Sequence, residues 1–155
     1  MNTRLLFLTI LSLSVLIFLS CSSVNTQKIS YYDSLDNLFA ERIVVSDQSS
    51  QISNIDVNLR FPENYKMLPE AEPFVKIFTK NEIIAEYPLK VSENIYPLNI
   101  EIKDKELYIH LGLFYCREGA QGLCLMKNII FTVELNPSKS REMLILNYEV
   151  LDEEY

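Results

Sequence analysis

Residues 107–116 read Leu-Tyr-Ile-His-Leu-Gly-Leu-Phe-Tyr-Cys, and this stretch decides the fold class. Apolar side chains occupy every second position from Leu107 to Tyr115. Strict alternation is typical of a half-buried strand, because successive side chains of a strand point to opposite faces of its sheet. Such a strand packs its apolar face on a core, and the sequence therefore predicts an antiparallel sheet here.

The same period of two recurs before and after this stretch. Alternating residues are found at 57–61, 98–102, 129–135 and 144–150, and shorter strand candidates at 43–45, 74–79 and 83–87. About eight strands separated by turn signals are typical of a β-sandwich. The absence of a ten-residue helical pattern in residues 43–150 argues against alternating strands and helices. We predict an all-β chain with a single immunoglobulin-like antiparallel β-sandwich of about seven or eight strands over residues 43–155.

The segment between Cys116 and Cys124 holds two glycines in a short polar run, which predicts a hairpin loop. Symmetric pairing about this loop places Cys116 opposite Cys124 and Phe114 opposite Met126. Opposed Cβ atoms lie about 4.5–5.5 Å apart and a disulfide requires about 3.5–4.5 Å, so local twisting brings the bond within reach. Export would provide the oxidising conditions that the bond requires.

Two roles for this cysteine pair stay open. A structural staple across so short a loop would contribute about 2–3 kcal/mol to stability. A redox-active pair is the sharper hypothesis, because a bond between directly opposed strand residues is often strained and easier to reduce. Arg117 would favour a thiolate, whereas Glu118 opposes it. Phe114, Tyr115 and Met126 flank the pair and would shield it. We favour the staple, since most disulfides of secreted domains are structural.

The first twenty residues are typical of an export signal. A positive charge at Arg4 precedes a nearly unbroken apolar run from Leu5 to Leu19, which is short for a membrane-spanning helix. The run ends at Ser20-Cys21, and a small residue directly before a cysteine resembles a bacterial lipobox, in which the cysteine becomes the lipid-modified N-terminus. An ordinary secretory signal cut near Ser20 is the alternative. We predict lipidation of Cys21, which also accounts for the odd number of cysteines.

Removal of residues 1–20 would leave a polar stretch before the first predicted strand. We expect residues 21–42 to form a tether between lipid and domain. Apolar residues at helical spacing predict a short helix within it, over Tyr31 to Arg42. The lipid would anchor the chain in the bacterial envelope, with the domain facing the periplasm or the cell surface.

The charge balance limits the partners and the chemistry. The 155 residues carry 14 Lys and Arg against 21 Asp and Glu, a net charge of −7, which leaves no basic surface for nucleic acid. His110 is the single histidine, and it could ligate a metal only together with the thiols of Cys116 and Cys124, a site with which oxidation competes. The sequence has neither a phosphate-binding loop nor a nucleophile turn. We predict no catalytic residue, metal or cofactor.

Two segments together resemble a known family. Residues 59–73 read Leu-Arg-Phe-Pro-Glu-Asn-Tyr-Lys-Met-Leu-Pro-Glu-Ala-Glu-Pro, and residues 113–119 read Leu-Phe-Tyr-Cys-Arg-Glu-Gly, continuing through Cys124 to Phe131. They are similar to the C-terminal β-sandwich domain of NHL-repeat proteins that also carry a thioredoxin-like domain, and distantly to the N-terminal periplasmic domain of the DsbD thiol:disulfide interchange protein. The resemblance implies an immunoglobulin-like sandwich in which Cys116 and Cys124 are the hairpin cysteines. It implies no other functional residue.

These features predict a lipid-anchored, non-enzymatic binding or accessory module of the bacterial cell envelope. Its partners would be the membrane, through the lipid, and another exported protein. The alternative function is thiol–disulfide exchange through the pair Cys116 and Cys124. Because the chain carries no thioredoxin Cys-x-x-Cys motif, such exchange would need a separate thioredoxin-like protein.

Overall fold

The strand pattern of the sequence is realised as two packed layers in the computed structural model, which describes residues 30–90, 93–98, 102, 104–119 and 124–151. A helical turn, α2 (Tyr31–Ser34), and a 3₁₀ turn, η1 (Leu35–Asn37), precede the sheet. A second 3₁₀ turn, η2 (Pro69–Ala71), follows the second strand. The strands are β1 (Glu41–Arg60), β2 (Tyr65–Met67), β3 (Phe74–Phe78), β4 (Ile83–Pro88), β5 (Ile95–Pro97), β6 (Glu106–Arg117) and β7 (Cys124–Glu149).

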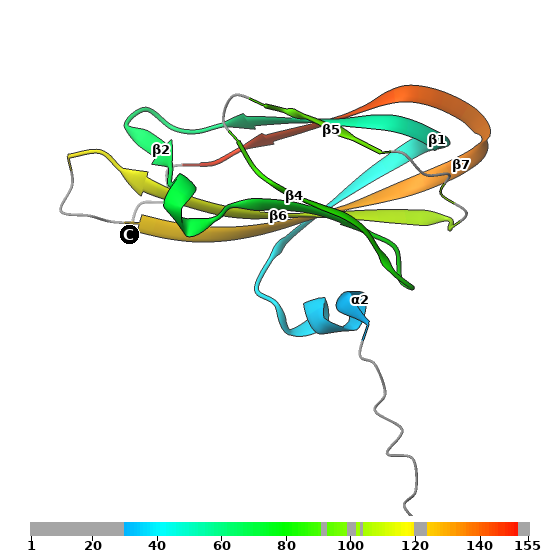
Figure 1. Ribbon diagram of the computed structural model, residues 1–155, viewed down its shortest axis with the longest axis horizontal. Coiled ribbons are helices and arrows are strands. Elements are labelled where there is room, and N and C mark those ends of the chain that lie inside the picture. Colours follow the sequence, from blue (N-terminus) through cyan, green and yellow to red (C-terminus); the bar gives the residue numbers. More distant parts are fainter. Residues whose placement is uncertain (1–29, 91–92, 99–101, 103, 120–123, 152–155) are drawn as a thin grey trace, which may run out of the picture.

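The long strands β1 and β7 connect the two layers, because each of them bends from one layer into the other (Figure 1). One layer has the order β4, β3, β6 and then the first parts of β7 and β1. The other layer contains the later parts of β7 and β1, with β5 at its edge. Two register shifts interrupt the β1–β7 ladder between Val45 and Gln51, in the part of β1 that bends. Such irregularities increase the local bend of a strand.

The predicted all-β sandwich is confirmed, and the strand assignments differ in detail. The candidates at 43–45 and 57–61 belong to one strand, β1, and those at 129–135 and 144–150 to one strand, β7. β1 and β7 run parallel, whereas we expected an antiparallel sheet throughout. Alternation reports which face of a strand is buried and carries no information on the direction of its neighbour.

Two further assignments concern short strands. β2 was not predicted, and it pairs antiparallel with the end of β6. The strand predicted at 98–102 falls largely outside the described residues, because 99–101 are among those not described. Leu98 and Ile102 are both buried, and β5 lies directly before them.

The main core lies between the layers. Alternate residues of β6 from Leu107 to Tyr115 point into it, as predicted, and all of them are buried. They meet buried side chains of the opposite layer, including Ile55 of β1 and Leu146 of β7. Each fully buried aliphatic side chain contributes about 1.5–3 kcal/mol relative to an exposed one.

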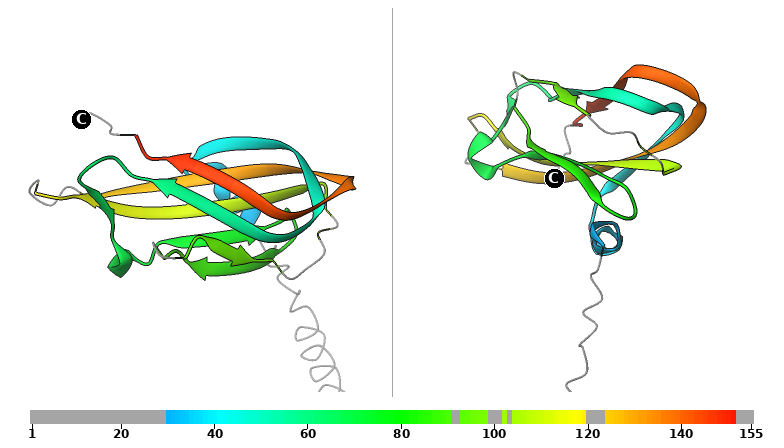
Figure 2. Two further views of the ribbon diagram at one scale, coloured as in Figure 1. Left: turned by 90° about the horizontal axis from the view of Figure 1, so that it is seen from above. Right: turned by 45° about the vertical axis from the view of Figure 1, so that its right-hand side comes forward.

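A second, smaller core covers the outer face of the same layer. Residues 30–40, here called the N-terminal segment, lie against this face (Figure 2). Leu35 is buried there with Phe78, Tyr108 and Ile130. The middle of β6 is therefore buried on both faces, which explains why its even-numbered positions also carry large or apolar side chains.

The N-terminal segment corresponds to part of the predicted tether. Ser30 caps α2, since its Oγ accepts a hydrogen bond from the backbone N–H of Asp33 at 3.2 Å. The helical turns end at Asn37, earlier than the helix predicted over Tyr31 to Arg42, because the chain is already extended at Glu41 to pair with β7. The guanidinium of Arg42 donates to the carbonyl of Leu35 at 2.8 Å and ties the end of the segment to β1.

Candidate functional site

The hairpin between β6 and β7 carries the predicted cysteine pair. Cys116 lies opposite Cys124 and Phe114 opposite Met126, as the sequence indicated. The two sulfur atoms form a disulfide, and the Cα atoms are 4.0 Å apart. The bond sits on the outer face at the end of the hairpin, with Cys124 exposed and Cys116 half-buried.

The residues that flank the pair divide between the two faces of the sheet. Phe114 and Met126 share the outer face with the disulfide, where Phe114 is half-buried and Met126 is 63% exposed. Tyr115 points to the opposite face, is buried, and packs against the rings of Phe61 and Tyr65. Tyr115 therefore does not shield the sulfur atoms, because neighbouring side chains of a strand alternate between faces.

Charged side chains of both signs stand near the cysteines. β2 places Lys66 across from Cys116, and the Lys66 ammonium pairs with the carboxylate of Glu118. The guanidinium of Arg117 lies 5.9 Å from the centre of the Tyr65 ring. The positive charge that would stabilise a thiolate is thus partly balanced by a carboxylate of the same hairpin.

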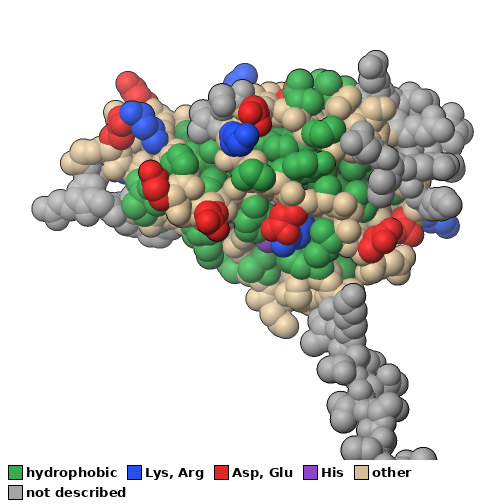
Figure 3. All heavy atoms as spheres, in the orientation of Figure 1, with side chains coloured by type: hydrophobic (Ala, Val, Ile, Leu, Met, Phe, Trp, Pro, Cys, Tyr) green, Lys and Arg blue, Asp and Glu red, His purple; other side chains and the backbone are tan. Residues whose placement is uncertain are grey.

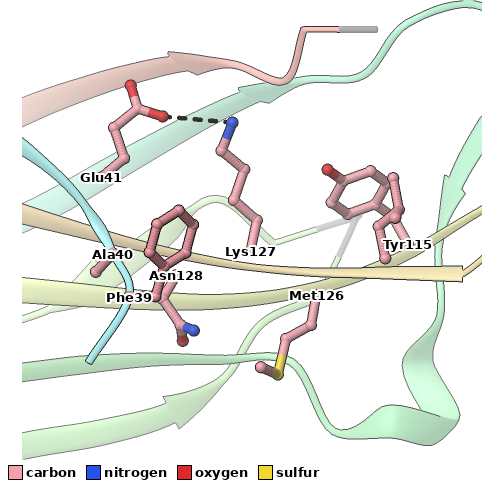
Figure 4. A pocket seen from close by; sticks show the side chains of 8 residues that line it. Phe39, Ala40, Glu41, Tyr115, Met126, Lys127 and Asn128 are labelled. Carbon is pink, nitrogen blue, oxygen red and sulfur yellow. Dashed lines mark ion pairs between the residues drawn. The ribbon is translucent and has the colours of Figure 1, made fainter. Parts of the chain in front are cut away.

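A pocket of about 260 Å³ opens beside this hairpin, at the edge of β7. Figure 4 shows Lys127 and Glu41 pointing toward each other on one side of β7, and Met126 pointing to the other side. The Lys127 Nζ and a Glu41 carboxylate oxygen are 3.4 Å apart. Phe39, at the rim, is fully exposed. The lining residues are Phe39, Ala40, Glu41, Tyr115, Leu125, Met126, Lys127 and Asn128.

His110 lies on the outer face further along β6 and is buried, with 3% of its surface exposed. Its Nε2 is 3.0 Å from the amide oxygen of Asn128, and its Nδ1 is 2.6 Å from the hydroxyl of Tyr31. An amide oxygen only accepts, so Nε2 carries the proton and Nδ1 accepts from Tyr31. The ring of Phe74 meets the imidazole edge-on.

The electrostatics keep this pair neutral. Burial lowers the pKa of His110, and the nearby Lys76 ammonium lowers it further, while the hydrogen bond from Nε2 to Asn128 acts in the opposite direction. Burial, with a smaller effect of Glu86, raises the pKa of Tyr31 to about 12. Lys76 lies 4.4 Å from the centre of the Tyr31 ring and 3.2 Å from a Glu86 oxygen. The phenol is therefore a stable donor to the imidazole.

The arrangement of these groups bears on metal binding and on membrane insertion. Within the described ranges, no three His, Cys, Asp or Glu side chains gather as a set of metal ligands. His110 is occupied by Tyr31 and Asn128, and the sulfur atoms of the cysteines are bonded to each other. In the same ranges, no helix has the length and apolar character needed to cross a membrane. Cys21 lies outside the described residues.

The contact between the N-terminal segment and the outer face was not predicted from the sequence. The signal was the helical spacing of apolar residues around Leu35 together with large side chains at even positions of β6, such as Tyr108. Each feature alone is compatible with a solvated segment or a half-exposed strand, and only the combination predicts that one covers the other.

The chain matches no protein-family model, and no curated protein matches it at a significant level.

Proposed function

We propose that the chain is an exported, lipid-anchored module of the bacterial cell envelope that binds another exported protein and is not an enzyme. One observation carries this proposal. Two exposed apolar side chains, Phe39 and Met126, border a pocket at the start of β7 beside the disulfide. Apolar and aromatic side chains around a hollow are typical of surfaces that a protein partner covers.

The face drawn in Figure 3 carries both apolar and charged side chains. Charged side chains of both signs are interspersed on the face drawn in Figure 3. Such a surface favours solubility. Lipidation at Cys21 would add a membrane anchor while leaving the domain in water. An anchored domain with an apolar docking patch suits an accessory role in the envelope.

Site-specific photocrosslinking in the bacterium that makes the chain tests this proposal. A photoreactive phenylalanine analogue replaces Phe39, and the control places the analogue at Ile145, which is 53% exposed on the later part of β7. We expect a discrete adduct with one envelope protein from position 39 and none from position 145. The purified partner should bind the full chain, and Phe39→Ser should weaken binding at least 10-fold. Equal labelling from both positions, or no adduct from position 39, would contradict the proposal.

Thiol–disulfide exchange is the second candidate, and the exposure of Cys124 favours it. A thiolate of a thioredoxin-like protein would attack one sulfur of the disulfide and release the other as a thiolate, which takes up a proton. The second thiol of that protein would then break the mixed disulfide. The chain would gain two electrons and two protons, and the thioredoxin-like protein would become the oxidised member. Replacing the second cysteine of the thioredoxin-like protein with alanine would trap the mixed disulfide on the unaltered chain, whereas Cys116→Ala and Cys124→Ala, which lack the disulfide, would form no such adduct.

A further inference from the structure

The edge of β7 from Cys124 to Asn128 has a strand on one side only. β6 pairs with it along its whole length. On the opposite side the ladder with β1 begins at Glu41 and Ile129, so no strand of the described part of the chain pairs with Cys124–Asn128 there. An unpaired edge offers a row of backbone donors and acceptors to another chain.

The orientation of the backbone groups on this edge follows from the ladder. The Phe114 carbonyl accepts a hydrogen bond from the Leu68 N–H at 2.7 Å, on the β2 side of β6. Phe114 therefore turns its backbone groups away from β7, and its opposite residue, Met126, belongs to a non-hydrogen-bonded pair. The N–H and C=O of Met126, and by the same alternation those of Cys124, point outward from the edge.

The space along this edge continues the path of β1. Traced back from β1, the N-terminal segment leaves the line of the strand and passes to the outer face of the sheet. Leu35 is buried there, and the Arg42 guanidinium binds the Leu35 carbonyl. Phe39 and Ala40 then lead into β1 at the rim of the pocket. An added strand would thus extend an existing ladder rather than begin a new one.

We propose, on the basis of the proposed function, that the exported partner inserts an extended segment which adds to β7 as a strand along Cys124–Asn128. Main-chain hydrogen bonds to Met126 and Cys124 would supply affinity that does not depend on sequence. One face of the added strand would place a side chain against Phe39 and Met126, and the other face would place one in the pocket over Leu125. The segment recognised would carry apolar side chains on both faces.

A second copy of this chain fits the edge less well. Stable interfaces bury about 1,200–2,000 Å² in total, whereas the stretch of β7 that has a strand on one side only, among the described residues, is five residues long, Cys124–Asn128. Each copy also carries a net charge of −7, which opposes self-association. A short extended peptide needs only the edge and the pocket beside it.

Two substitutions at one position separate main-chain pairing from side-chain packing. Met126→Pro removes the outward N–H, which β6 does not use, while Met126→Ala keeps this N–H and removes the side chain. The probe is a displayed library of random decapeptides, selected on the full lipidated chain in detergent. We expect the enriched peptides to carry apolar residues at alternating positions. Met126→Pro should lower their affinity at least 10-fold more than Met126→Ala does.

Amide hydrogen exchange provides a second readout on the unaltered chain, which is needed if Met126→Pro does not fold. Binding of an enriched peptide should slow exchange of the Met126 amide at least 10-fold. The Lys127 amide faces β6 and should change little. Unchanged exchange at Met126, equal affinities of the two variants, or no enriched peptide would each overturn strand addition.

The photocrosslinking result distinguishes failure of the strand-addition proposal from failure of the proposed binding function. An adduct from position 39 with unchanged Met126 exchange would retain a binding module and reject strand addition. No adduct from position 39 would reject the binding module itself. An adduct between two copies of the chain would replace the exported partner with self-association and would overturn this inference.

Discussion

The hydroxyl of Tyr31 donates a hydrogen bond to Nδ1 of His110 over 2.6 Å and joins two residues 79 positions apart. The bond is partly buried, and Asn128 holds the other ring nitrogen at 3.0 Å. Tyr31, in the N-terminal segment, therefore completes the hydrogen bonding of the buried His110 imidazole on β6. The N-terminal segment is consequently part of the folded unit.

Tyr31→Phe tests the strength of this link. The substitution keeps the ring under Lys76 and beside Phe78 but leaves Nδ1 of His110 buried without a donor. An unsatisfied buried acceptor costs about 1–3 kcal/mol, and we expect that loss in the free energy of unfolding measured by urea denaturation. The control is Tyr87→Phe, which removes an exposed hydrogen bond to the Pro97 carbonyl and should cost less than about 0.5 kcal/mol. Equal losses in the two variants would argue against the link.

The lowered pKa of His110 predicts a pH dependence of stability. Above about pH 6.5 the imidazole is neutral in both the folded and the unfolded chain. As the pH falls below that value, the unfolded chain takes up a proton first, and the free energy of unfolding decreases by up to about 1.4 kcal/mol per pH unit until the folded chain is protonated as well. Protonation also converts Nδ1 into a donor and removes the acceptor of Tyr31.

Comparison with His110→Gln isolates this contribution. A glutamine can offer both a donor and an acceptor but does not titrate. Urea unfolding between pH 5.5 and 8 should therefore give a flatter profile for the variant than for the unaltered chain. Parallel profiles would assign the pH dependence to carboxylates instead.

Gly112 gives a steric prediction on the same face. A Cβ at this position would lie 2.3 Å from Cε1 of Phe74, the residue directly opposite on β3. The Phe74 ring also packs against His110 and cannot move freely. Gly112→Ala should lower the free energy of unfolding by about 1–3 kcal/mol. In a Phe74→Ala background the same change should be close to neutral, and an equal loss in both backgrounds would contradict the steric cause.

Much of the fold followed from the alternation of side chains. The register Phe114 opposite Met126 was predictable because one turn fixes the pairing of a hairpin. The parallel pairing of β1 with β7 was not predictable, because it joins segments far apart in the sequence. Neither segment carries a local signal for its partner. The predicted strands flanking both bends proved continuous because a bent strand resembles two strands with a turn between them.

The candidate site was only partly predictable for a related reason. The disulfide followed from hairpin geometry, and the structure contains it. The pocket combines Phe39, before the first strand, with Met126, on the last one. Only the tertiary fold brings these two residues together. His110 was considered as a metal ligand, and one of its two actual partners, Tyr31, comes from a segment expected to be solvated.

Lipidation of Cys21 is testable directly. A bacterium that expresses the chain should incorporate labelled palmitate into it, and the mature protein should partition into the detergent phase. Cys21→Ser should abolish both properties. The matched control, Ser22→Ala, keeps the cysteine and should leave both unchanged. Label retained in Cys21→Ser would place the lipid elsewhere, and an unlabelled, secreted chain would favour an ordinary signal cut near Ser20.

We predict that the Cys116–Cys124 disulfide is structural and that it also supports the neighbouring edge of β7. We expect a reduction potential below about −300 mV, the range of structural disulfides, measured by thiol trapping in glutathione buffers. The bond closes a short loop, with Cys116 and Cys124 eight positions apart. The double variant Cys116→Ala/Cys124→Ala should therefore lose about 2–3 kcal/mol of stability. Cys124 also begins the free edge, so fraying of the hairpin end should weaken peptide binding. A potential above about −230 mV, with full stability and unchanged peptide binding in the double variant, would instead support thiol–disulfide exchange as the function.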